Sequence, residues 1–194
     1  MIMQAQEPKI YTPEEYLDLE VNADIRHEYI NGEIIPIAGG TPNHNEITSI
    51  LNAMLRVILK GKPYSIFVAD QRLWIPKFGM YTYPDVMVVS KPLELQTGRT
   101  DTIVNPVMIA EVLSNSTKSY DKDEKFAAYR TIPTFQEYLL IDQYTQHVEQ
   151  YSKTDPNKWI FSEYNSPENC LKLESIPLEI PLADLYSDIE FETK

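Results

Sequence analysis

The chain has 194 residues with 17 basic and 29 acidic side chains, which gives a formal net charge of −12. This length is enough for one domain with a core of its own, and such an acidic chain is repelled at long range by nucleic acid and anionic membranes. The single cysteine, Cys170, excludes an internal disulfide and a cysteine-based zinc finger. No apolar run approaches the roughly 18 residues that cross a bilayer, and residues 1–10 lack the pattern of a secretory signal. We therefore expect a cytoplasmic protein with one domain over residues 12–194 and a flexible end over residues 1–11.

The charge is spread unevenly along the chain. Five basic residues and only one acidic residue, Asp70, lie between positions 56 and 77, whereas the C-terminal third is strongly acidic. A basic surface is therefore compatible with the overall charge, and its candidates are Arg56, Lys60, Lys62, Arg72 and Lys77.

The first predicted elements are a helix and a β-hairpin. Thr12, Pro13 and Glu15 are typical of a helix start, and that helix runs to about residue 20. Asn31-Gly32 lies between two strand-like runs, residues 25–30 and 33–38, and favours a two-residue type I′ turn. This turn would pair Glu28 with Ile35, and alternation then places the Glu28 carboxylate on an apolar face.

The remaining pattern mixes strands with helices. Residues 42–61 predict a long helix because apolar residues recur at helical spacing, and residues 121–130 and 181–185 predict shorter helices. Strands are expected at residues 65–69, 71–76, 83–89, 107–113, 137–142, 147–152, 159–164 and 178–180. The class is therefore α/β or α+β, with a mixed β-sheet core flanked by helices.

Two carboxylates in this pattern indicate a metal site. Asp85 opens one apolar strand and Glu111 interrupts the next, where a buried charge is costly unless a cation meets it. Antiparallel pairing of the two strands would bring both carboxylates to the same end of the sheet. Oxygen ligands without cysteine or clustered histidine favour Mg²⁺ or Mn²⁺ over zinc.

A lysine and a third carboxylate complete the hypothesis. Asp121, Lys125 and Tyr129 are spaced four apart and share one face of the helix that follows Glu111. An ammonium group near the metal can orient water or stabilise charge on a phosphate. Glu28, Asp85, Glu111 and Lys125 are therefore the candidate catalytic residues for metal-assisted phosphodiester hydrolysis.

Each residue also has a structural interpretation. Pro84-Asp85 is common turn chemistry, Lys125 can be held by Asp121 and Glu124 on a solvated helix face, and Glu28 can pair with Arg26 or His27. His44, at the start of the long helix, is interpreted as a residue of its capping region.

Five segments together resemble a known family: "HEYINGEII", "YPDVMVV", "IAEVLSNST", "YDKDEKFAAYR" and "EYLLID". The set is similar to the Uma-two type of restriction endonuclease, within the PD-(D/E)XK nuclease superfamily. The resemblance implies a restriction-endonuclease-like fold, with Asp85 and Glu111 as metal ligands and Glu28 as the acidic residue before the core helix. The superfamily pattern has lysine two positions after the acidic residue, where this chain has Leu113, so the resemblance implies that Lys125 supplies this charge from the next helix.

The sequence therefore predicts a Mg²⁺-dependent (or Mn²⁺-dependent) endonuclease that acts on DNA. RNA processing would use the same metal chemistry and stays open. The rival hypothesis is a non-catalytic module on the same fold that binds a protein or dimerises, which the net charge of −12 favours. A homodimer is also compatible with cutting both strands of a duplex.

Overall fold

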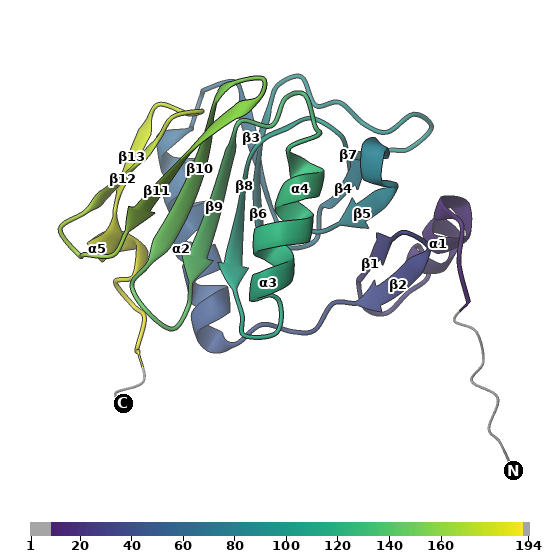
Figure 1. Ribbon diagram of the computed structural model, residues 1–194, viewed down its shortest axis with the longest axis horizontal. Helices are drawn as coiled ribbons and strands as arrows, with labels where there is room; N and C mark the ends of the chain where they lie inside the picture. The colour runs from purple at the N-terminus through teal and green to yellow at the C-terminus, as the bar shows by residue number, and fades with distance from the viewer. Residues whose placement is uncertain (1–8, 192–194) are drawn as a thin grey trace, which may run out of the picture.

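The computed structural model describes residues 9–191 and contains two main β-sheets and a small third one (Figure 1). Most of the expected flexible end, residues 1–8, lies outside the described residues. Among residues 9–191, no helix combines the length and the apolar composition that crossing a bilayer requires. The strands are β1 His27–Ile30, β2 Glu33–Pro36, β3 Tyr64–Val68, β4 Arg72–Ile75, β5 Met80–Thr82, β6 Val86–Ser90, β7 Thr102–Ile103, β8 Pro106–Leu113, β9 Glu137–Asp142, β10 Val148–Asp155, β11 Lys158–Tyr164, β12 Cys170–Leu173 and β13 Leu178–Pro181.

The helices connect and cover these strands. They are α1 Pro13–Glu20, α2 Pro42–Ile58, η1 Pro76–Phe78, α3 Lys118–Tyr120, η2 Asp121–Lys125, α4 Phe126–Tyr129 and α5 Leu182–Leu185, of which η1 is a 3₁₀ turn and η2 a π-helical turn. The segments α3, η2 and α4 follow one another without a break, so they form one irregular helix.

The N-terminal helix and hairpin form as their local signals predict. Thr12 caps α1 in a reciprocal arrangement with Glu15. Asn31 and Gly32 have φ angles of 50° and 95°, as a type I′ turn requires. The predicted register is confirmed, because Glu28 pairs with Ile35 across the hairpin. The hairpin belongs to the five-stranded sheet, which has the order β2-β1-β5-β4-β7.

The six-stranded sheet has the order β11-β10-β9-β8-β6-β3. Strands β6 and β8 are antiparallel neighbours, as predicted, whereas β8 and β9 are parallel, so the sheet is mixed. The pairing of Val86 with Ala110 brings the start of β6 beside the C-terminal half of β8. Asp85 and Glu111 each lie one residue from this pair, and the topology therefore brings them together.

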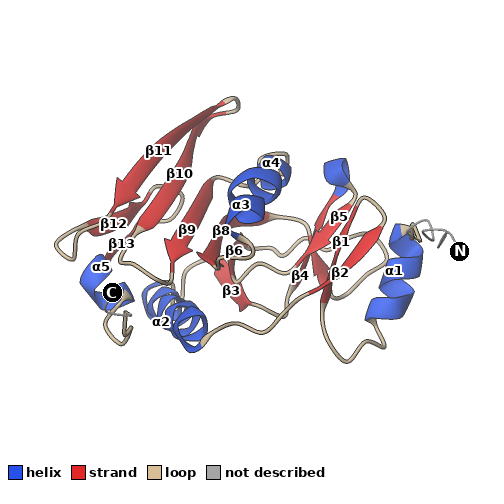
Figure 2. Cartoon of the chain, turned by 60° about the horizontal axis from the view of Figure 1, so that its bottom comes forward, coloured by secondary structure: helices blue, strands red, loops and turns tan. Residues whose placement is uncertain are grey.

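Helices cover both faces of the six-stranded sheet (Figure 2). The face toward α2 buries Ile47, Leu51 and Leu55 of that helix in the same core as Ala110 and Val112 of β8. The opposite face buries Ile109 and Leu113 with Phe126 and Tyr129 of α4. Because side chains alternate along a strand, Glu111 shares this second face and points toward the irregular helix.

Three short strands, β5, β7 and β12, are absent from the sequence prediction. They have two to four residues each, too few for an alternating pattern to stand out. The long helix ends at Ile58 instead of residue 61, and Gly61, with φ of 77°, lies in the following turn.

Candidate active site

Asp85 and Glu111 meet at one end of the β6–β8 pair. The Asp85 amide donates to Glu111 Oε2 at 3.1 Å, and the Val112 amide donates to Asp85 Oδ2 at 2.8 Å. Each carboxylate is therefore held by a backbone amide next to the other carboxylate. This reciprocal arrangement fixes both side chains on the rigid part of the sheet.

Lys125 lies at the centre of a group of carboxylates. Its Nζ atom is 3.2 Å from Glu28 Oε1, 3.3 Å from Glu111 Oε1 and 3.2 Å from Asp121 Oδ1. Its side chain is only 9% exposed, so the interpretation as a solvated helix face does not hold. The contact with Asp121 does exist, but inside the protein.

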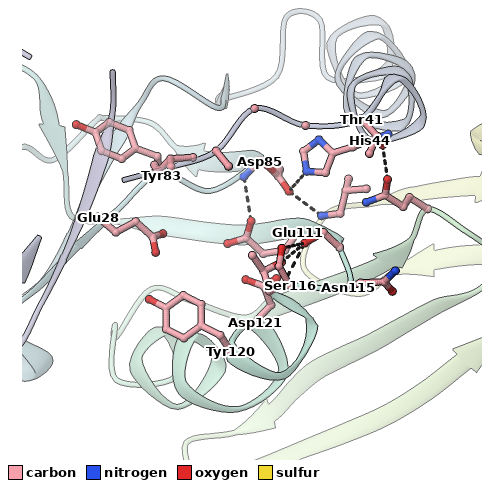
Figure 3. Close-up of a pocket in the computed structure, with 18 of the residues that line it drawn as sticks. Glu28, Thr41, His44, Tyr83, Asp85, Glu111, Asn115, Ser116, Tyr120 and Asp121 are labelled. Carbon is pink, nitrogen blue, oxygen red and sulfur yellow. Dashed lines mark hydrogen bonds and ion pairs between the residues drawn. The ribbon is translucent and has the colours of Figure 1, made fainter. Parts of the chain in front are cut away.

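Glu28 reaches this group from the other sheet. The predicted alternative partners are engaged elsewhere, since Arg26 pairs with Asp70 and His27 with Glu20. Thr82 of β5 donates a hydrogen bond to the same Glu28 oxygen that contacts Lys125. The four predicted residues Glu28, Asp85, Glu111 and Lys125 therefore line one cavity of about 660 Å³. Figure 3 shows Glu28, Asp85 and Glu111 in this cavity.

Burial perturbs the charges of the site. Glu28, Glu111, Asp121 and Lys125 are 2–7% exposed. Burial raises the pKa of Glu111 and of Asp121, and the nearby Lys125 ammonium only partly offsets this effect. Burial alone would lower the pKa of Lys125, but the carboxylates of Glu111, Glu28 and Asp121 outweigh it and hold that pKa well above its usual value.

The sequence prediction missed three contributors to this arrangement. Tyr129 donates a hydrogen bond of 2.8 Å to Glu111 Oε1. Their spacing places Asp121 and Tyr129 on the Lys125 face and offers Asp121 as a surface partner of Lys125, but it assigns neither residue to the site. His44 was interpreted as a capping residue, whereas Thr41 caps α2 and the His44 ring lies 3.1 Å from Asp85 Oδ2. Only the fold reveals this contact, because 41 positions separate the two residues in sequence.

A hydrogen-bond network from α1 supports the turn before Asp85. The Tyr83 hydroxyl donates to Glu20 Oε1 at 2.9 Å and accepts from Arg72 Nε at 2.9 Å. Tyr83 is thereby fixed two residues before Asp85. Arg72 is buried and its guanidinium contacts Tyr83 and Asp101. It is therefore not part of the basic surface that its sequence context suggested.

Another group of candidate ligands lies away from this cavity. Within residues 9–191, ligand atoms of His147, Glu149 and Glu163 lie within 4.8 Å of one another at the β10–β11 pair. Glu149 is already in contact with Lys122, and Glu163 is half exposed.

Comparisons with known proteins identify the family of the chain. Residues 13–183 match the model of the Uma2 family, described as "Putative restriction endonuclease". The chain is 46% identical over 155 residues to the "Uncharacterized protein sll1609" of Synechocystis sp. strain PCC 6803, covering 80% of this chain and 88% of that relative. It is 34% identical over 184 residues to "Uncharacterized protein slr1290" of the same organism, covering 95% of each chain.

A solved structure shares the fold. The crystal structure of a "putative nuclease belonging to DUF820" from Anabaena variabilis ATCC 29413 superposes with a TM-score of 0.75 and 21% sequence identity, covering 91% of this chain and 97% of that one. The predicted class, a mixed sheet flanked by helices, is thereby confirmed.

Proposed function

The chain belongs to the Uma2 family, and from this premise and the geometry of the cavity we propose that it is a metal-dependent endonuclease that hydrolyses phosphodiester bonds in DNA. The observation that carries the proposal is the convergence of Glu28, Asp85 and Glu111 with Lys125 in one cavity. These residues come from different elements, and a simple stability role does not require three carboxylates around one buried ammonium with a fourth, Asp85, beside them.

The residues of the cavity fit a hard divalent cation. Most of the polar side chains that line the cavity offer oxygen atoms, four carboxylates among them, and Cys170 lies outside it. Three buried carboxyl groups face one ammonium, and burial raises the pKa of Glu111 and of Asp121. A bound cation would stabilise the ionised forms that burial disfavours. Mg²⁺ is commonly bound through one or two carboxylates together with substrate phosphates, and we assign these two ligands to Asp85 and Glu111.

Lys125 and Glu28 orient the reacting groups and balance charge in the cavity. A bound divalent cation would polarise the phosphate and lower the pKa of a coordinated water. Lys125 holds Glu28, Glu111 and Asp121 in place and supplies positive charge at the reacting phosphate. Glu28 uses Oε1 for its contacts with Lys125 and Thr82, so we assign Oε2 as the acceptor of a proton from water.

A separate basic hollow is a candidate for binding the DNA backbone. Arg56, Lys60, Lys62 and Lys91 line a cavity of about 570 Å³ that no acidic residue lines. The hollow lies at the Ser90 end of β6, whereas Asp85 precedes the other end of this strand. Five residues of extended strand separate Asp85 from Ser90 by about 16 Å. We propose that phosphates of one DNA strand contact this hollow while a phosphate several nucleotides along the same strand reaches the carboxylates, since successive phosphates advance by about 3.4 Å along the helix axis.

Charge reversal tests the role of the basic hollow. Lys60→Glu together with Lys62→Glu should weaken binding of a DNA duplex in low salt and reduce the dependence of affinity on salt concentration. Lys153→Glu with Lys158→Glu, on the β10–β11 hairpin, is the matched control. Equal affinity in both double variants would remove this hollow from the proposal.

Cleavage of supercoiled plasmid tests the activity. The wild-type protein with Mg²⁺ should produce nicked or linear DNA, and EDTA should stop the reaction. Asp85→Asn should lower the rate by at least about 100-fold, whereas Asp123→Asn, an exposed aspartate on the irregular helix, should not. Equal rates for wild type and Asp85→Asn would refute the proposal. Linear product that forms without a nicked intermediate would indicate that two copies act together. A single-stranded RNA substrate in parallel separates DNA from RNA cleavage.

The second candidate is a non-catalytic binding module on the nuclease fold. The net charge of −12 favours it, because long-range repulsion opposes the approach of nucleic acid. Absence of cleavage by wild type on plasmid, linear DNA and RNA with both Mg²⁺ and Mn²⁺ would support this candidate over the first.

A further inference from the structure

His44 makes a direct contact with a proposed metal ligand. Its Nε2 atom is 3.1 Å from Asp85 Oδ2, the same oxygen that accepts the Val112 amide at 2.8 Å. Two donors therefore hold one oxygen of the Asp85 carboxylate. Among residues 9–191, the other oxygen, Oδ1, accepts no hydrogen bond. Figure 3 shows the His44 ring between α2 and Asp85, on the wall of the cavity.

The surroundings fix the ring in this position. The His44 amide donates to Thr41 Oγ1 in the first turn of α2. Gly40 packs so closely that a Cβ atom there would lie 2.7 Å from His44 Nδ1. Within the described part of the chain, Nδ1 is buried and has no hydrogen-bond partner. The ring therefore directs its one polar contact at Asp85.

The start of α2 is also tied to the strand that carries Glu111. Thr41 donates to Gln143 Oε1, and Gln143 Nε2 donates to the Leu113 carbonyl at 2.7 Å. His44 is therefore mounted on a helix end that is linked to β8, two residues beyond Glu111. A ring held this way has a defined position relative to both carboxylates.

We propose that His44 is a positioning residue of the metal site, which holds Asp85 Oδ2 so that Oδ1 stays free for a divalent cation. This inference rests on the proposed function, because it requires Asp85 to be a ligand. Groups that orient metal ligands by hydrogen bonds raise metal affinity, and their loss typically costs about 10–100-fold.

The alternative role of His44 is to fill space between α2 and β6. Two substitutions separate the roles. His44→Phe keeps a ring of similar size without the donor, whereas His44→Gln keeps a donor nitrogen at a similar distance from the backbone. Gly40→Ala leaves the imidazole intact but crowds its Nδ1 side, so it displaces the donor without removing it.

The experiment measures Mn²⁺ affinity of the full chain by electron paramagnetic resonance of the free ion, together with the thermal unfolding temperature. All variants carry His147→Ala, because the group of His147, Glu149 and Glu163 could also bind Mn²⁺. We expect His44→Phe and Gly40→Ala to weaken Mn²⁺ binding by about 10–100-fold, and His44→Gln to retain most of the affinity.

Three results would overturn the inference. Unchanged affinity in His44→Phe would show that the contact does not position Asp85. Equal loss in His44→Phe and His44→Gln, with equal falls in unfolding temperature, would indicate a space-filling role. Absence of Mn²⁺ binding in the His147→Ala parent would refute the metal site itself. This outcome is distinguishable from failure of the inference about His44, because the parent protein has an intact His44.

Discussion

Replacing Lys125 by methionine should destabilise the protein strongly at neutral pH. Methionine has a similar length and no charge, so the substitution removes the ammonium and leaves Glu28, Glu111 and Asp121 buried together. At an effective dielectric constant of about 20, one carboxylate at 3.2 Å attracts the ammonium by about 5 kcal/mol. Desolvation of the ammonium offsets much of this attraction.

The net cost follows from what remains in the cavity. Removing one partner of a buried ion pair costs about 3–5 kcal/mol. We expect a cost of about 4 kcal/mol, because three carboxylates lose their common partner. The cost should shrink as the pH falls from 7.5 to 5, since the carboxylates of the variant then take up protons and no longer repel one another.

Urea unfolding followed by tryptophan fluorescence measures this cost. With a slope of about 2 kcal/mol per molar urea, a loss of about 4 kcal/mol lowers the midpoint by about 2 M. Lys122→Met is the matched control, because the Lys122 side chain is 28% exposed and contacts the one carboxylate of Glu149. This substitution should cost clearly less than Lys125→Met. Adding Asp121→Asn to Lys125→Met should restore part of the loss. A loss below about 1 kcal/mol for Lys125→Met, or a loss independent of pH, would refute this electrostatic account.

Three further predictions concern stability. Burial raises the pKa of Glu111 and Asp121, so the folded protein binds protons at these groups more tightly than the unfolded chain. The unfolding free energy of the metal-free protein should therefore fall as the pH rises through these raised pKa values. Mn²⁺ should reduce that fall, and a pH profile insensitive to Mn²⁺ would contradict the assignment of the metal site. Glu137 is fully buried and accepts the amides of Glu174 and Ser175, so Glu137→Ala should cost about 3 kcal/mol in urea unfolding without changing Mn²⁺ affinity. Gly32→Ala should cost about 1–2 kcal/mol, because φ is 95° and the added Cβ would lie 2.5 Å from the Ile10 side chain; an unchanged unfolding midpoint would be evidence against this strain.

Local signals account for most of what the sequence predicted correctly. The Asn31-Gly32 turn fixes the hairpin register within a few residues. Asp85 precedes one apolar strand and Glu111 interrupts the next long one, and antiparallel pairing of these two strands is enough to bring the carboxylates together. These inferences need only adjacent elements, so they do not depend on the rest of the fold.

Long-range packing decided what the sequence could not show. Spacing of four residues placed Lys125 beside Asp121, but only the packing of the irregular helix on the sheet shows that this face is buried. His44 reaches Asp85 through the position of α2, and no local pattern encodes that position. Arg72 counted as a basic residue in sequence, yet its contacts with Tyr83 and Asp101 remove it from the surface.

The central claim is that Asp85 and Glu111 hold a divalent cation in the cavity beside Lys125. Its most direct test is a crystal soaked in Mn²⁺ and measured for anomalous scattering. We expect a peak bonded to carboxylate oxygens of Asp85 and Glu111, at about 2.1 Å from each. A well-diffracting crystal with no peak in this cavity, or with a peak only at His147, Glu149 and Glu163, would contradict the claim.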